Sequence, residues 1–139
     1  MITIRPAQPA DQSSVLAILK ELDIYYSALD FTCFYVAEDD QEIVGMAQFT
    51  EYDTFYFLGS LGVKPTYQKR GVGKIILNYL FNHIKKDVYI YTVIPNYFKR
   101  YGFEIISPIP PYLPAKDRYE CEDCFSDRCV CMKRSHYAA

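Results

Sequence analysis

The stretch Val63-Lys64-Pro65-Thr66-Tyr67-Gln68-Lys69-Arg70-Gly71-Val72-Gly73-Lys74 decides the fold that we expect for this chain. It follows an apolar run at 55–63 and precedes a segment at 72–84 whose apolar residues recur with the period of a helix. The pattern predicts a strand, a turn with two glycines, and a helix. Glycine lets the backbone approach a ligand closely, and the first turn of a helix presents unpaired N–H donors at a positive dipole end. The turn is therefore suited to an anion such as a pyrophosphate.

The charge of this stretch supports a small anionic ligand. It contains four cationic side chains and no acidic one, whereas the whole chain of 139 residues carries a formal net charge of −2. A mildly acidic protein is not expected to bind nucleic acid through its overall charge. The glycine spacing matches neither the G-x-G-x-x-G of dinucleotide-binding turns nor the G-x-x-x-x-G-K-[ST] of P-loops.

The composition indicates one folded domain over residues 1–139. Half of the residues are hydrophobic, and a chain of this length can bury a sizeable core. Residues 1–6 show no signal-peptide pattern, and no apolar run approaches the roughly 20 residues that span a bilayer. We therefore expect a cytoplasmic protein without a membrane partner.

The periodicity along the chain predicts an α+β fold, with a mixed and mainly antiparallel sheet flanked by helices. Asp11 is the predicted N-cap of the first helix. The three strands nearest the glycine turn form a meander, and the strand after the following helix implies a right-handed βαβ crossover. The predicted strands lie at 3–5, 34–38, 43–52, 54–63, 88–94, 103–106 and 130–133, and the predicted helices at 11–22, 72–84, 96–100 and 115–123.

Two motifs resemble those of a known family. The segment Gln68-Lys69-Arg70-Gly71-Val72-Gly73 resembles the acyl-CoA motif Q/R-x-x-G-x-G/A of the GNAT superfamily of N-acetyltransferases. The segment Asn96-Tyr97-Phe98-Lys99-Arg100-Tyr101-Gly102-Phe103 resembles the second GNAT signature, roughly [FY]-[YF]-x-x-x-G-F. The resemblance covers about residues 1–106. It leaves 107–139 as a Pro-rich segment, a Cys-containing tail and the last strand.

The resemblance implies that the chain transfers an acetyl group from acetyl-CoA to a primary amine. The backbone of the strand before the turn would bind the pantetheine arm, the turn itself would bind the pyrophosphate, and the helix of the second motif would lie beside the arm. The cofactor-binding residues implied in this way are Leu61, Val63, Gln68, Lys69, Arg70, Gly71, Val72, Gly73, Lys74, Asn96 and Phe98.

The sequence departs from the family pattern at the expected acid. Many members have a tyrosine four residues before the glycine of the second motif, and that position is Phe98 here. Tyr97 and Tyr101 flank it and are the candidate catalytic residues. The strand at 55–61 carries no carboxylate, and Glu51 and Asp53 at its entrance are interpreted as turn residues, so the sequence names no general base.

The acceptor is less well defined than the cofactor. A looser resemblance to the small N-acetylglutamate-synthase-like branch favours a small, amino-acid-like acceptor. The alternatives are a peptide N-terminus, a polyamine, or a non-catalytic protein that senses acyl-CoA or binds metal. An exposed sheet edge makes a homodimer plausible.

Four cysteines near the end of the chain form a separate feature. Their spacing is Cys121-x2-Cys124-x4-Cys129-x-Cys131. Four thiolates suit tetrahedral zinc, and C-x-x-C is a frequent half-site, although the x4 connector is tight for one ion. The alternative interpretations are that two of the cysteines form a redox-sensitive or disulfide pair, or that the thiols are inert and buried. Zinc is a possible ligand that we do not favour.

Overall fold

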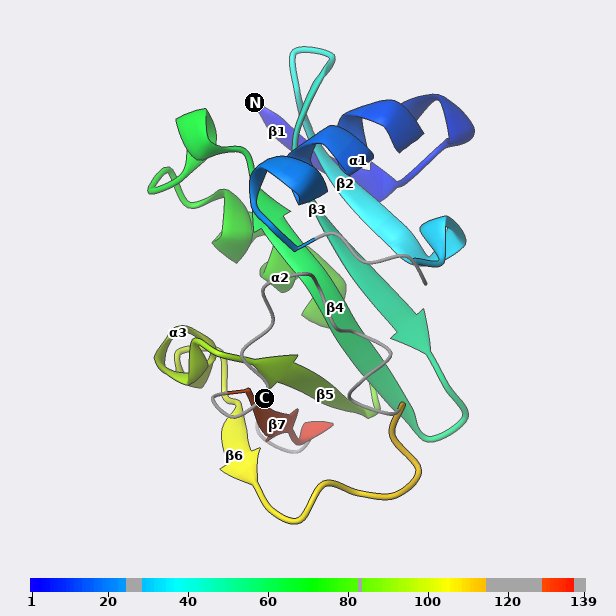
Figure 1. Cartoon of the computed structure of the whole chain (residues 1–139), viewed down its shortest axis with the longest axis vertical. Helices are drawn as coiled ribbons and strands as arrows, with labels where there is room; N and C mark the ends of the chain where they lie inside the picture. Colours follow the sequence, from blue (N-terminus) through cyan, green and yellow to red (C-terminus); the bar gives the residue numbers. More distant parts are fainter. Residues whose placement is uncertain (25–28, 83, 115–128, 137–139) are drawn as a thin grey trace.

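A seven-stranded sheet, in the order β1-β2-β3-β4-β5-β7-β6, organises the computed structural model, which describes residues 1–24, 29–82, 84–114 and 129–136 (Figure 1). Neighbouring strands are antiparallel except β4 and β5, which are parallel. The predicted mixed and mainly antiparallel sheet is therefore confirmed. The strands are β1 (Ile2–Pro6), β2 (Phe34–Asp39), β3 (Glu42–Glu51), β4 (Phe55–Val63), β5 (Asp87–Thr92), β6 (Glu104–Ile106) and β7 (Val130–Arg134).

The helices cover both faces of the sheet. In Figure 1, α1 lies in front of the sheet and α2 lies behind it. Side chains alternate between the two faces along each strand, so Phe34 and Val36 pack with α1 whereas Ala37 packs with α2. The α-helices are α1 (Gln12–Glu21), α2 (Val72–Phe81) and α3 (Pro95–Lys99), and the 3₁₀ turns are η1 (Pro9–Asp11), η2 (Phe31–Cys33) and η3 (Pro65–Tyr67).

A two-residue turn closes the hairpin between β2 and β3. Asp40 and Gln41 connect the two strands and both have positive φ, 50° and 69°. Positive φ at both central residues is the geometry of the two-residue turn that matches the twist of the flanking strands. The hairpin end is fixed in this way next to the turn that precedes α2.

The prediction for α2 was partly wrong. The helix ends at Phe81 rather than at residue 84, because Asn82 has an extended backbone with ψ 129°. The apolar period of 72–84 also predicts that Ile75 and Tyr79 lie on the buried face, but they are 39% and 48% exposed. The buried stripe of α2 consists of Val72, Ile76, Leu77 and Leu80.

Asp11 does not cap α1 as predicted. It lies in helical conformation and makes no side-chain cap to α1. Its carboxylate accepts from the backbone N–H of Gln8 at 2.7 Å and from two guanidinium nitrogens of Arg5 at 2.7 and 3.1 Å. Arg5 also contacts Glu38 at 3.2 Å. Asp11 therefore joins β1 to the start of α1 rather than capping that helix.

Asp11→Asn should destabilise the fold at pH 7 by about 1–3 kcal/mol, because it removes a charge-assisted contact from a largely buried carboxylate. The hydrogen bond from Arg5 holds the pKa of Asp11 below its usual value. Its contribution is therefore present above the unfolded pKa of about 4 and is lost as the pH falls toward the folded pKa. Denaturant unfolding from pH 7 to pH 2 should show the gap between wild type and variant closing at low pH.

Glu38→Gln is the matched control for this prediction, since its more exposed carboxylate makes one contact with the same guanidinium. It should cost less than Asp11→Asn. A gap for Asp11→Asn that stays constant down to pH 2 would contradict the assigned ion pair.

Candidate functional site

Strands β4 and β5 separate midway along the sheet, and this fork is the centre of the candidate site. Their parallel pairing joins 55–58 to 87–90 and extends no further among the described residues. Figure 1 shows β4 continuing toward the turn before α2, whereas β5 leads to α3. The N–H and C=O groups on the open edge of β4 can therefore bind an extended ligand as a neighbouring strand would.

The bend in β4 at the fork comes from a bulge. The register with β3 shifts so that Ser60 and Leu61 together face the single residue Ala47. An extra residue of this kind disrupts the ladder and bends the strand. Ser60 has φ 52°, and its buried hydroxyl has no hydrogen-bond partner among the described residues. A buried polar group without a partner costs about 1–3 kcal/mol, and backbone strain concentrates at functional sites.

The turn at 64–71 lies beyond the end of β4 and leads into α2. Lys69 and Gly71 both have positive φ, 66° and 80°, and Gly71 is the N-cap of the helix. The backbone N–H of Ile75 donates to the Gly71 carbonyl at 3.1 Å. The N–H groups of the first three helical residues precede this bond and are left for a ligand at the positive end of the helix. A Cβ atom at Gly71 would meet no other atom within 4 Å, so the space beside this residue is open.

The hairpin between β2 and β3 holds this turn in place. The Tyr67 hydroxyl donates to Asp39 at 3.2 Å, and the Lys64 ammonium contacts Glu42 at 2.6 Å. The guanidinium of Arg70 lies 4.8 Å from the centroid of the Tyr67 ring. Three side chains of the turn are thus fixed by contacts outside or within it, and the backbone donors are oriented before a ligand arrives.

The predicted pyrophosphate-binding residues come together in this turn, but they differ in what they can offer. Gln68 donates its side-chain amide to the Val63 carbonyl at 3.0 Å, which shapes the turn. Val72 is 1% exposed and belongs to the core, so only its backbone N–H is accessible. Lys69 and Lys74 are exposed and available to an anion.

Of the two candidate tyrosines, Tyr97 lies on α3 and Tyr101 lies in the turn that follows it, and the Tyr97 side chain packs against the start of α2. A Cβ added at Gly73 would lie 2.5 Å from the Tyr97 hydroxyl oxygen. The Tyr101 hydroxyl lies 3.5 Å from that of Tyr97. Burial raises the pKa of Tyr97, so its phenol stays protonated at neutral pH. The Tyr97 hydroxyl thus lies against Gly73, the second residue of α2, close to the proposed anion-binding turn.

The other residues assigned from the second motif take different positions. Phe98 is 6% exposed and packs against Phe103, with ring centroids 5.7 Å apart. Asn96 is exposed on the first turn of α3. Leu61 and Val63 are partly buried on β4 and pack against the core between the sheet and α2.

The sequence analysis missed an aromatic surface on the opposite face of the fork. Tyr89 and Tyr91 project from β5 onto this face, where the Pro-rich segment crosses them. The Tyr89 and Tyr112 hydroxyls lie 2.7 Å apart, and the Tyr91 hydroxyl donates to the Pro114 carbonyl. Burial raises the pKa of Tyr91 to about 12. The two-residue spacing of these tyrosines within an apolar strand indicates that both side chains lie on the same face of the sheet. The spacing does not indicate that the Pro-rich segment covers them.

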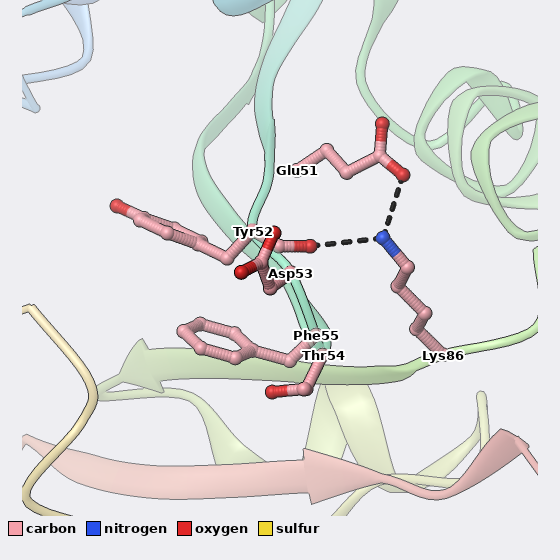
Figure 2. Close-up of a pocket in the computed structure, with 6 residues that line it drawn as sticks. All are labelled: Glu51, Tyr52, Asp53, Thr54, Phe55 and Lys86. Atoms are coloured by element: carbon pink, nitrogen blue, oxygen red, sulfur yellow. Dashed lines mark hydrogen bonds and ion pairs between the residues drawn. The ribbon is translucent and has the colours of Figure 1, made fainter.

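A hollow of about 670 Å³ lies at the other end of β4 (Figure 2). Glu51 ends β3, Asp53 lies in the turn before β4, and both line the hollow. Glu51 forms an ion pair with Lys86 at 2.8 Å. These carboxylates therefore lie at the start of β4, away from the fork, and neither is placed to act as its base.

The cysteine prediction falls largely outside the described residues. Cys121 and Cys124 lie in the segment that the structure does not describe. Cys131 is buried in β7 beside Phe57 and Tyr89, and Cys129 precedes the strand. Within the described ranges, no group of three or more His, Cys, Asp or Glu residues could hold a metal ion. Zinc binding by the four cysteines stays the untested alternative that the sequence does not favour.

The chain belongs to the GNAT acetyltransferase family. The family model for the acetyltransferase (GNAT) domain matches residues 30–105, more than half of the chain, and the match includes both motifs and the fork. No helix among the described residues is long and apolar enough to cross a membrane.

Solved structures of GNAT proteins have the same fold. N-acetylglutamate synthase from Neisseria gonorrhoeae, solved with coenzyme A and N-acetyl-glutamate, is 19% identical with a TM-score of 0.77, and the alignment covers 97% of this chain and 35% of the synthase. A GNAT acetyltransferase from Staphylococcus aureus Mu50 is 15% identical, with a TM-score of 0.74 and coverage of 98% and 99%. The ribosomal-protein-S18-alanine N-acetyltransferase from Escherichia coli is 15% identical, with a TM-score of 0.69 and coverage of 97% and 94%. The chain thus spans about a third of the gonococcal synthase and nearly all of the other two.

Gly71→Glu should weaken acetyl-CoA binding at least tenfold, because it places a carboxylate in the open space in front of the turn. Gly71→Ala is the matched control, since both variants carry the strain of a side chain at φ 80°, about 1–2 kcal/mol, and differ only in charge and length. Isothermal titration calorimetry of both variants measures the effect. Equal affinities for the two variants would contradict the assignment of the anion site.

Proposed function

We propose that this domain transfers an acetyl group from acetyl-CoA to a primary amine, and that the acceptor is a small, amino-acid-like molecule. One observation carries the proposal. The open edge of β4 leads directly to the turn at the start of α2, where the space beside Gly71 is open, so a strand-like arm and a pyrophosphate can be bound together at one site.

The roles of the chain's own residues follow from this geometry. Backbone groups of Leu61 and Val63 bind the pantetheine arm, and the N–H groups at the start of α2, with Lys69 and Lys74, bind the pyrophosphate. Acetyl-CoA supplies a thioester carbon. The neutral amine forms a bond to this carbon, the carbon–sulfur bond breaks, and the thiolate takes up a proton while the amine loses one. Tyr97 and Tyr101 are the proposed proton donors for the thiolate.

Two of the similar structures bear on the class of acceptor. The similarity to N-acetylglutamate synthase favours an amino-acid acceptor. The similarity to the S18-alanine N-acetyltransferase favours a peptide N-terminus as the second candidate. We also propose that the protein acts in the cytoplasm, with a homodimer formed through a sheet edge as an expectation for its assembly.

Thermal-shift measurement with acetyl-CoA, followed by thiol release with panels of free amino acids, N-terminal peptides and polyamines, tests the proposal. A higher melting temperature with thiol release for the amino acids is the expected result. Thiol release with N-terminal peptides alone would show that the acceptor is a peptide N-terminus and not a free amino acid. Binding without release for any amine would favour an acyl-CoA sensor, and no binding would overturn the proposal.

Tyr97→Phe should lower kcat about 10²-fold with little change in KM for acetyl-CoA if its phenol protonates the thiolate. Tyr101→Phe tests the second proposed donor, whose hydroxyl lies 3.5 Å from that of Tyr97, and full activity in both variants would leave the thiolate without an assigned acid. Because burial raises the pKa of Tyr97 above its usual value, the wild-type rate should show no decline from ionisation of this group below about pH 10. A rise in KM without loss of kcat would instead assign Tyr97 to cofactor binding.

A further inference from the structure

A second hollow, of about 410 Å³, lies between the end of α2 and the sheet. We call it the tyrosine hollow. It is separate from the fork, because it begins on the last turns of α2 whereas the anion-binding turn lies at the other end of this ten-residue helix, roughly 15 Å away. Its lining residues are Tyr35, Phe49, Glu51, Tyr56, Tyr79, Leu80, Asn82 and Ile84.

The walls of the tyrosine hollow are mainly aromatic. Phe49 and Tyr56 stack in parallel with ring centroids 4.6 Å apart, and Tyr35 and Tyr79 meet at 6.1 Å with a tilt of 56°. Tyr79 is 48% exposed, so the hollow is reached from solvent past its ring. The faces of aromatic rings attract cations, most strongly where water is partly excluded.

The rim of the tyrosine hollow carries the carboxylate of Glu51, which also lines the first hollow and is paired there with the ammonium group of Lys86. The Lys86 ammonium lies 2.8 Å from the Glu51 carboxylate, 2.9 Å from the Tyr52 carbonyl and 5.4 Å from the centroid of the Tyr56 ring. Figure 2 shows Lys86 reaching toward both oxygen acceptors. The chain itself thus demonstrates that Glu51 and Tyr56 together accommodate an organic ammonium ion.

The contact made by Lys86 is easily displaced. The Glu51 side chain is 60% exposed and that of Lys86 30% exposed, and ion pairs at such positions contribute little to stability. A ligand that carries a methylated ammonium group would keep the attraction to Glu51 and to the rings. It would also bury its methyl groups against Leu80 and Ile84, which a primary ammonium cannot do.

We propose that the tyrosine hollow is a binding site for small molecules with a methylated ammonium group, and that Lys86 competes with such a ligand for the Glu51 carboxylate. The four aromatic side chains supply the walls, Glu51 supplies the charge, and Leu80 and Ile84 supply apolar surface. The site is separate from the proposed acetyl-transfer site and from the turn proposed to bind acetyl-CoA.

Titration of the ¹⁵N-labelled protein with choline, followed by two-dimensional amide spectra, tests the proposal. The uncharged isostere 3,3-dimethylbutan-1-ol is the matched probe, because it has the same shape without the charge. Choline should shift the amides around Tyr79 and Asn82, and the alcohol should bind at least tenfold more weakly. Equal affinity for the two probes, or shifts confined to the turn at 64–71, would overturn the proposal.

Lys86→Met should bind choline severalfold more tightly than wild type, since it removes the internal ammonium and leaves the walls and Glu51 intact. Lys85→Met is the control, because Lys85 is an exposed lysine one position earlier and its loss should leave choline affinity unchanged. Tyr79→Ala should weaken choline binding at least fivefold while the thermal shift with acetyl-CoA stays as in wild type. A trimethyllysine peptide that binds more tightly than choline would identify a protein-borne ligand with the same group.

A Lys86→Met variant that folds, as judged by its melting curve, and binds choline no better than wild type would overturn the role of Lys86 as competitor. Unchanged choline affinity in Tyr79→Ala would overturn the placement of the site.

Discussion

The bulge at Ser60 and Leu61 is the feature on which the rest of the candidate site depends. If β4 and β5 paired over their full lengths, their backbone donors and acceptors would satisfy one another and no edge would remain inside the sheet. The bulge ends the pairing of β4 with β5 after four residues, so the sheet loses the hydrogen bonds that further pairing would form. The separation leaves β4 an open edge that ends at the anion-binding turn. A ligand that pairs with that edge would restore what the sheet loses.

The turn beyond β4 is prepared for a negative charge by contacts that lie outside the motif itself. Lys64 and Tyr67 are held by Glu42 and Asp39, at the two ends of the β2–β3 hairpin turn. These contacts neutralise part of the positive charge of the stretch, yet Lys69 and Lys74 stay exposed at the start of α2. The helix terminus and two lysines therefore present the charge, while the hairpin limits the number of conformations that the turn can adopt before it binds.

The sequence was most informative where the cause of a structure is local. A glycine with positive φ, a strand before it and an apolar period after it are all encoded within about 25 residues, so the turn, α2 and the parallel β4–β5 pair could be predicted. The insertion of β7 between β5 and β6 could not, because it depends on contacts between residues about 40 apart along the chain. The same holds for the Pro-rich segment over Tyr89 and Tyr91. Asp11 was wrongly assigned as a cap because its partner, Arg5, belongs to another element.

The two glycines of the motif meet different physical requirements, which the sequence pattern alone does not distinguish. Gly71 is needed for its backbone, since its φ of 80° is strained for other residues, and a side chain there would point into open space. Gly73 has an ordinary helical backbone, and the Tyr97 hydroxyl occupies the space that a side chain at this position would need. The close approach at Gly73 is therefore made first by the protein itself. It joins α3 to α2, and so sets the distance between the second motif and the anion-binding turn. The motif thus encodes the placement of a tyrosine hydroxyl as well as the approach of a ligand.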